Sequence, residues 1–362
     1  MANSSKKTTG EGCISLFGIP FFQNCLKGST DNNDKRNLVI HLSTEEDYSS
    51  DSDDPSIEIS GDPSSGSNLV SHLVAHLLSS NGDETGDVCK MHFEGALDGS
   101  DVLAKVVQVI EKRGFTPENT RYAQSVCPDE INQEEGDITD IFTKYMGEVF
   151  NMGGLAGLPF IGRTGFAAFT HHVADEGHCF VLMAPRIGIS ATHKLGKYTR
   201  DGQHGQQVSA CGAAVGALEH CECGKKPPSA KYDFLDSQMN FIIRQVNANK
   251  KAILKNAKTE DEKMKALVHQ IWKIGKYMML DDIVHANFGG KNSKLLVLTG
   301  IQINMPRPYQ DMFQPLTFTM LSKDKSSSTS QKSSKNSGES APNKVEDLFQ
   351  ETFGHKAPNI FV

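Results

Sequence analysis

Residues 165–189 read GFAAFTHHVADEGHCFVLMAPRIGI, and this stretch decides the fold. It contains two short apolar runs, 165–173 and 179–189, separated by the turn-forming residues 174–177. Short apolar runs on either side of a turn are typical of paired, buried strands. The stretch therefore predicts two neighbouring strands in the interior of the protein.

Amphipathic helices are predicted around this stretch, because apolar residues recur there at helical spacing. One clear stripe includes Val102, Leu103, Val106 and Val107, and Gly114 marks its end. Helices interleaved with short buried strands favour an α/β fold, in which helices flank a central sheet. The other predicted helices span residues 69–78, 137–151, 208–218, 233–256 and 260–287, and the other predicted strands span 121–126 and, as the last one, 295–304.

The composition excludes several classes of protein. None of the apolar runs in the 362 residues approaches the roughly 18 residues of a membrane-spanning helix, so an integral membrane protein is excluded. The net charge of -7 argues against a nucleic-acid partner bound mainly through phosphates. Eight cysteines are too few for a disulfide-stapled secreted domain in so long a chain, so reduced thiols, some of them metal ligands, fit better.

Four regions follow from the local composition. Residues 1–66 form an N-terminal extension whose second half is acidic and rich in Ser, Gly and Pro, and we expect a disordered linker there. Residues 67–320 form the folded body. Residues 321–343, rich in Ser, Lys and Asn, are predicted to be a second disordered linker. Residues 344–362 form a short C-terminal segment with amphipathic spacing.

The two ends of the chain carry weaker signals. The apolar positions Val345, Leu348, Phe349 and Phe353 have the spacing of one short helix, which either docks on the body or a partner or remains a partly ordered tail. The start of the chain has neither a clear secretory signal nor the arginine-rich pattern of a transit peptide. A cytoplasmic location is the default prediction, with a plastid as the alternative.

Two cysteines are candidates for a site. Cys127 directly follows a predicted strand, is freed by Pro128 and has Asp129 two residues later. Cys211 begins a predicted helix, whose N-terminus stabilises a thiolate. For Cys127 the alternative is an inert buried thiol, and the small residues after Cys211 equally suit plain helix packing.

A histidine pair supplies the third candidate ligand. His171 and His172 precede the turn that contains Asp175. Neighbouring side chains on a strand face opposite ways, so only one of the two could face a given site, and a structural imidazole is the alternative. Two thiolates and one imidazole hold zinc well and leave a fourth position for water, whose pKa the metal lowers. The segment His220-Cys-Glu-Cys223 lacks a second cysteine pair and is interpreted as incidental.

Several ordered motifs also resemble one known family. The chain resembles the limiting-carbon-dioxide-inducible protein B family of algae, which includes the theta-class carbonic anhydrases and whose fold is similar to that of beta carbonic anhydrase. The resemblance covers about residues 69–320. The motifs that carry it are CPDEIN (127–132), FNMGGLAGLPFIGRTGFAAFTHHVADEG (150–177), CFVLMAPRIGIS (179–190), ACGAA (210–214) and LTGIQIN (298–304).

The resemblance implies a ligand set and an acidic partner for it. It assigns zinc to Cys127, His172 and Cys211, with His172 preferred to His171 because of its place before the turn. Asp129 is implied to orient the zinc-bound solvent. Its arginine partner is implied to be Arg200, with Arg163 as the fallback, and Phe166 and Phe169 are suggested for the carbon dioxide pocket.

The chain departs from the family pattern at Arg186, where histidine is more usual, and at Ala210, where a second cysteine is common. The implied function is zinc-dependent hydration of carbon dioxide to bicarbonate, in inorganic-carbon handling or a carbon-concentrating mechanism. The alternative is a catalytically inactive member that acts as a partner protein in a carbon-concentrating complex. The resemblance also implies a homodimer or a hetero-oligomer with a paralogue.

Overall fold

The computed structural model divides the chain into two units, residues 1–73 and 74–362, which are considered separately. In the first unit, β1 (Leu38–Ile40) and β2 (Ile57–Ile59) form a small antiparallel pair. The helix predicted at 69–78 and most of the two predicted linkers lie outside the described residues. The structure describes residues 38–40, 57–59, 84–132, 134–174, 176–200, 206–229, 235–255, 257–284, 288–290, 292–307, 309–323 and 343–358.

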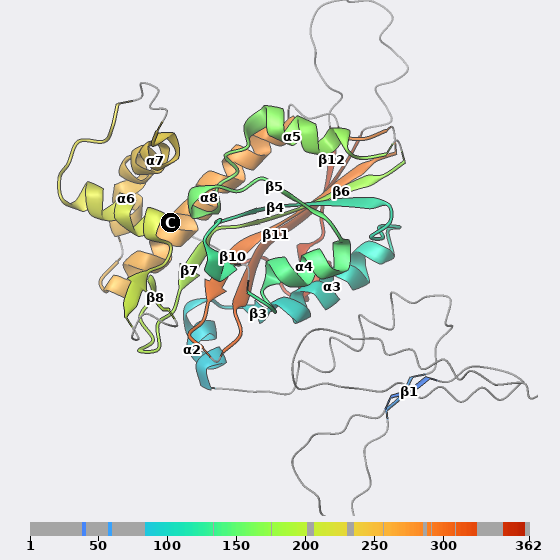
Figure 1. The fold of residues 1–362 in the computed structure, drawn as a ribbon, viewed down its shortest axis with the longest axis horizontal. Coiled ribbons are helices and arrows are strands. Elements are labelled where there is room, and N and C mark those ends of the chain that lie inside the picture. Colours follow the sequence, from blue (N-terminus) through green and yellow to red (C-terminus); the bar gives the residue numbers. More distant parts are fainter. Residues whose placement is uncertain are drawn as a thin grey trace, which may run out of the picture. The chain divides into compact units, whose positions relative to one another are not determined.

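The second unit is built on a mixed eight-stranded sheet, whose main path runs β12-β11-β10-β6-β4-β5 (Figure 1). The strands β10, β6, β4 and β5 are parallel to one another, whereas β11 and β12 add to the sheet in the antiparallel sense. The short β3 pairs with β11 and β7 pairs with β10. The strand bounds are β3 Leu97–Asp98, β4 Thr120–Val126, β5 Val149–Asn151, β6 His178–Ala184, β7 Arg186–Gly188, β10 Lys294–Asn304, β11 Met312–Lys323 and β12 Asn343–Asp347.

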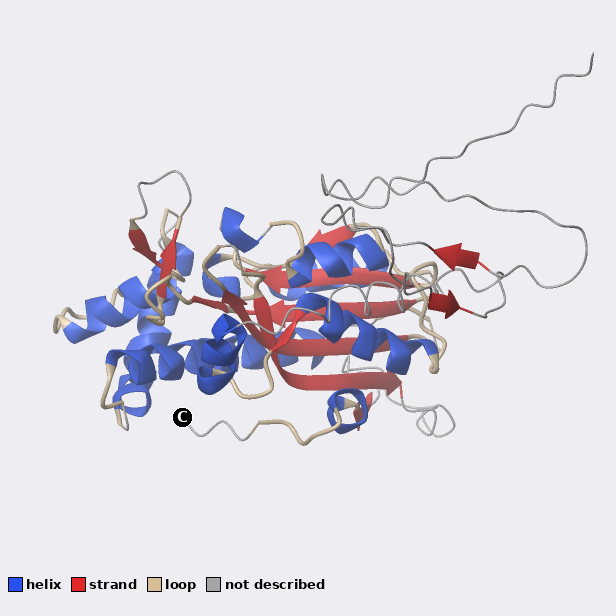
Figure 2. Ribbon diagram, turned by 90° about the horizontal axis from the view of Figure 1, so that it is seen from below, coloured by secondary structure: helices blue, strands red, loops and turns tan. Residues whose placement is uncertain are grey.

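Helices cover both faces of this sheet (Figures 1 and 2). The alternation along β6 shows why: Phe180 and Leu182 pack in the cluster with α3, α4 and α9, while Val181 and Met183 pack in the cluster with α5 to α8. A strand buried on both faces needs the continuous apolar run that 179–184 provides. The helix bounds are α2 Glu84–His92, α3 Gly99–Glu111, α4 Ile138–Met146, α5 Gly162–His171, α6 Gly212–Glu222, α7 Ser237–Leu254, α8 Glu260–Val284 and α9 Phe349–Phe353.

The predicted α/β architecture is confirmed, but the first of the two decisive apolar runs is not a strand. Residues 165–173 lie mostly in α5, which buries Phe166 and Phe169 on one side. These two residues are three positions apart and share a helical face, so the same apolar run also satisfies a helix. The prediction of two paired strands is therefore wrong for this run, while β6 confirms the second.

Two other predicted helices begin or end differently. The helix expected over 137–151 stops at Met146, because Gly147 adopts a positive φ of 88°, and β5 follows. The helix expected over 208–218 is preceded by β9 (Gln207–Ser209), which pairs with β8 (Lys197–Thr199) and projects as a hairpin. This hairpin matters for the site, because Arg200 directly follows β8.

The C-terminal segment completes the sheet and one helical layer. Residues 343–347 form β12 against β11, so 295–304 is not the last strand, and the predicted short helix begins only at Phe349. Leu348, Phe349 and Phe353 are buried in the same cluster as α3, whereas Val345 is exposed. Within the described part of the chain, no helix has the length and apolar character needed to cross a membrane.

Candidate functional site

A cleft opens where β4 and β6 end. Val126 and Ala184 are the last paired residues of these parallel strands, so Cys127 and Arg186 emerge at the same edge of the sheet. Ligands of parallel α/β sheets usually bind at the carboxyl ends of the strands. The N-terminus of α6, where Cys211 is the capping residue, closes the third side. The cleft has a volume of about 320 Å³ and is lined by Cys127, Pro128, Asp129, Glu130, Leu155, Arg186, Ser209, Cys211, Gly212 and Ala213.

Two arginines hold Asp129 at the mouth of this cleft. Arg200 donates from Nη2 to Oδ1 of Asp129 at 2.9 Å, the pairing that the resemblance implied. Arg186 donates from its own Nη2 to Oδ2 of the same carboxylate. Arg163, the fallback partner, instead pairs with Asp281 at 2.7 Å on the surface. Each carboxylate oxygen of Asp129 thus faces a guanidinium, which fixes its orientation.

The two cysteine thiols lie together at the bottom of the cleft. Cys127 and Cys211 are both buried, and Cys211 donates a hydrogen bond to the sulfur of Cys127. This hydrogen bond and the positive charge of Arg186, opposed by burial, lower the pKa of Cys127. Donation to Cys127, together with burial, raises the pKa of Cys211.

Arg186 is the functional residue that sequence reasoning did not place in the site. Its side chain is only 1% exposed, lies beside Cys127 in the cleft lining and donates from Nη1 to Oδ1 of Asn304 at 3.2 Å. Burial opposes its charge, but Cys211, Cys127 and Asp129 outweigh burial and raise its pKa. A charged residue inside the apolar run 179–189 was a usable signal, because a buried charge needs a partner.

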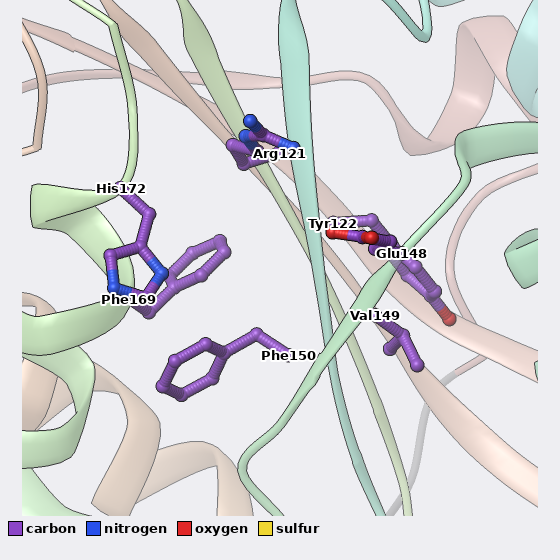
Figure 3. Close-up of a pocket in the computed structure, with 7 residues that line it drawn as sticks. All are labelled: Arg121, Tyr122, Glu148, Val149, Phe150, Phe169 and His172. Carbon is purple, nitrogen blue, oxygen red and sulfur yellow. The ribbon is translucent and has the colours of Figure 1, made fainter.

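The structure does not bring His172 to the two cysteines. His172 caps α5, is exposed, and packs against Phe150 with ring centroids 5.7 Å apart (Figure 3). It lines a second cavity of about 200 Å³ with Arg121, Tyr122, Glu148, Val149, Phe150 and Phe169. That cavity lies at the start of β4, and the five residue steps from Tyr122 to Cys127, about 17 Å along the strand, separate it from the end where Cys127 lies.

The physical reason is the helix at 162–171. Because this segment is a helix that connects two parallel strands, it returns the chain to the starting edge of the sheet, and β6 begins there after the turn. Of the two residues suggested for the carbon dioxide pocket, Phe169 lines the cavity of His172 and Phe166 is buried in the core. Neither is among the residues that line the cleft. The apolar side chains that line the cleft are those of Pro128, Leu155 and Ala213.

The donor set near Cys127 does not fit zinc. A catalytic zinc site uses three protein ligands and one open position. The cleft offers two thiols, and their third neighbour is a guanidinium, which has no lone pair to give to a metal. Across the residues that the structure describes, no three His, Cys, Asp or Glu side chains form a group able to hold a metal ion.

The segment 220–223, interpreted as incidental and exposed, is exposed only in part, because Cys223 is exposed whereas Cys221 is buried. The sulfur of Cys221 donates to the carbonyl oxygen of Ile243 at 3.8 Å, and the ring of His220 contacts the carbonyl oxygen of Lys226 at 3.1 Å. These contacts fasten the end of α6 to its surroundings. They leave both residues away from the cleft lining.

A buried polar network continues behind Arg186. Asn304 accepts from Arg186 and donates to Oδ2 of Asp311, and the backbone N–H of Met305 donates to Oδ1 at 2.7 Å. Burial raises the pKa of Asp311 to about 7. Burial, followed by the charge of Asp311, raises the pKa of nearby Asp137 to about 9. The folded protein thus holds protons on carboxyl groups that the unfolded chain releases.

We expect the free energy of unfolding to fall as the pH rises from about 5 to about 7, by about 1.4 kcal/mol per pH unit for each such proton. The sign follows because the folded-state pKa values lie above the unfolded value of 3.8, so the folded state binds more protons in this range. Asp137→Asn should make the dependence of the free energy of unfolding on pH shallower, by the contribution of one proton. Urea denaturation across the pH range measures it, with exposed Glu219→Gln as the control; equal slopes for both variants would contradict the prediction.

Comparison with known proteins assigns the chain to a family. Residues 96–322 match the family described as limiting CO2-inducible proteins B/C beta carbonic anhydrases, which is more than half of the chain. The chain belongs to this limiting-CO2-inducible B/C family. Among proteins with curated descriptions, none has a significantly similar sequence.

Solved structures of one family member agree with this assignment. The crystal structure of PtLCIB4, a homolog of the limiting CO2-inducible protein LCIB, is 27% identical, covers 66% of this chain and 95% of its own, and has a TM-score of 0.57. A histidine-to-alanine mutant of PtLCIB4 is 26% identical over 67% and 95% of the two chains, with a TM-score of 0.58. A serine-to-arginine mutant is 28% identical over 66% and 94%, with a TM-score of 0.53. A fold related to that of carbonic anhydrases thus surrounds the cleft.

Proposed function

We propose that this chain acts in inorganic-carbon handling as a non-catalytic member of its family, the second of the two functions that the sequence left open. The family description supports a role connected with carbon dioxide and bicarbonate. The observation that carries the non-catalytic part is Arg186, whose guanidinium lies against Cys127, Cys211 and Asp129. The family scaffold and the acidic residue are present, but the set of metal ligands is incomplete.

Zinc-dependent hydration is the function that the geometry disfavours. In enzymes of this kind the metal lowers the pKa of bound water so that hydroxide is available near neutral pH. Among the described residues, no third His, Cys, Asp or Glu joins Cys127 and Cys211 in a group able to hold a metal in that role. His172 would have to cross the length of β4 to supply it. The theta-class assignment remains a prediction from the resemblance.

A partner role fits the features that remain. We propose that the chain works as a subunit, either of a homodimer or of a hetero-oligomer with a catalytically competent paralogue. In such a complex, Asp129 clamped by Arg186 and Arg200 keeps the cleft rigid, since both oxygens of the carboxylate are occupied. The fold would then serve assembly, with turnover supplied by the other subunit.

Exchange of ¹⁸O between carbon dioxide and water tests this proposal on the full-length protein. We expect the purified chain, supplemented with zinc, to leave the exchange rate at the buffer value, with or without a chelator. The double variant Cys127→Ser/Cys211→Ser is the matched control and should behave as the wild type does. A chelator-sensitive acceleration that the double variant loses would instead establish the zinc-dependent enzyme.

A further inference from the structure

The place beside the two sulfurs is filled by a side chain of this protein. Arg186 follows β6, its side chain is 1% exposed, and its guanidinium contacts the Cys127 sulfur, Asp129 and Asn304. Arg186 is the first residue of β7, and its side chain is held by residues from two other parts of the sheet, the segment after β4 and the end of β10. Such a side chain is held by the fold and does not sweep freely through the cleft.

The charge of Arg186 balances its neighbours. The carboxylate of Asp129 pairs with this guanidinium, and the sulfurs of Cys127 and Cys211 line the same cleft. Buried charges are stable only when they are paired and hydrogen-bonded. A divalent cation between the sulfurs would compensate the same negative charges. The guanidinium already does so, and it would repel an incoming metal ion without offering it a lone pair.

The other parts of a three-ligand site are in place. Cys127 and Cys211 lie together in the cleft, and Arg200 holds Asp129 independently of Arg186. An imidazole at position 186 would be shorter than the arginine and could offer a neutral ring nitrogen to a metal between the sulfurs. Gly212, beside Cys211, has open space where a Cβ would stand, so the cleft next to the sulfurs is not crowded on that side.

We infer that Arg186 occupies the place of the third metal ligand and that this single residue keeps the chain from holding zinc. The inference deepens the proposed non-catalytic function, because it names the residue responsible for it. One substitution at position 186 would then complete a metal site, because the guanidinium now takes the place of the cation.

Zinc content measures this directly. Wild type, Arg186→His and Arg186→Gln are each incubated with zinc, dialysed and analysed by inductively coupled plasma mass spectrometry. We expect about one zinc per chain in Arg186→His and at least about tenfold less in the other two proteins. Arg186→Gln is the matched control, because it removes the charge without adding a strong ligand. Cobalt in place of zinc should give the thiolate-to-metal absorption of a tetrahedral site only in Arg186→His.

Folding is monitored by circular dichroism, and zinc should raise the melting temperature of Arg186→His alone, since a ligand of the native state stabilises it. Arg186→Cys provides a second three-ligand variant with a side chain that tolerates burial. One zinc per wild-type chain, lost in Cys127→Ser, would overturn the inference, and so would folded Arg186→His and Arg186→Cys proteins that take up none. If Arg186→Gln and Arg186→His contained equal amounts of zinc, position 186 would not supply the third ligand. Metal content is independent of ¹⁸O exchange, so metal-free hydration by the wild type would refute only the proposed function.

Discussion

Replacing Asp129 by alanine is expected to lower the free energy of unfolding by about 3–5 kcal/mol, because it leaves the buried guanidinium of Arg186 without its carboxylate partner. The side chain of Arg186 is 1% exposed, so water cannot replace the lost contact unless the site opens. Arg200 loses the same partner but keeps Glu130 and partial exposure. Chemical denaturation of wild type and variant at neutral pH measures the difference.

An exposed ion pair provides the matched control. Asp281→Ala removes the partner of Arg163 in a pair whose side chains are 57% and 58% exposed, and we expect a loss of less than about 1 kcal/mol. The double variant Asp129→Ala/Arg186→Met should recover most of the stability, since an apolar side chain replaces the unpaired charge. If Asp129→Ala cost no more than Asp281→Ala, Arg186 would not be a buried, paired charge.

The sequence predicted the elements whose apolar pattern suits only one structure. The stripe that became α3 and the two long helices α7 and α8 have helical spacing over several turns, and β10 is a long run rich in branched apolar residues. Residues 165–173 failed because a short apolar run with Phe166 and Phe169 three positions apart fits a strand and a helix equally well. Only the path of the chain between two parallel strands decides between them.

The wrong prediction of a strand at residues 165–173 also affects the expected position of His172 in the site. Cys127, Asp129 and Cys211 could be predicted to lie together, because the carboxyl end of a buried parallel strand and a helix N-terminus are local features of the sequence. The placement of His172 depended on the length and direction of the connection before β6. The role of Arg186 depended on contacts with residues more than fifty positions away, such as Cys127 and Asn304. Local patterns carry no information about such contacts.

Replacing Phe349 by alanine is expected to cost about 3–5 kcal/mol, because Phe349 is 1% exposed and packs with Phe353 at a ring-centroid distance of 4.8 Å. The sequence left open whether this segment docks or stays a partly ordered tail, and the two interpretations predict opposite results. The nearby Val345 is 62% exposed in β12, so Val345→Ala should stay within about 0.5 kcal/mol of wild type. Denaturation of both variants compares them, and equal stabilities would mean that the segment does not belong to the cooperative unit. A large difference in the free energy of unfolding between the two variants would instead show that residues 343–353 fold with the body. Truncating a side chain outside the core would not destabilise the protein by that much.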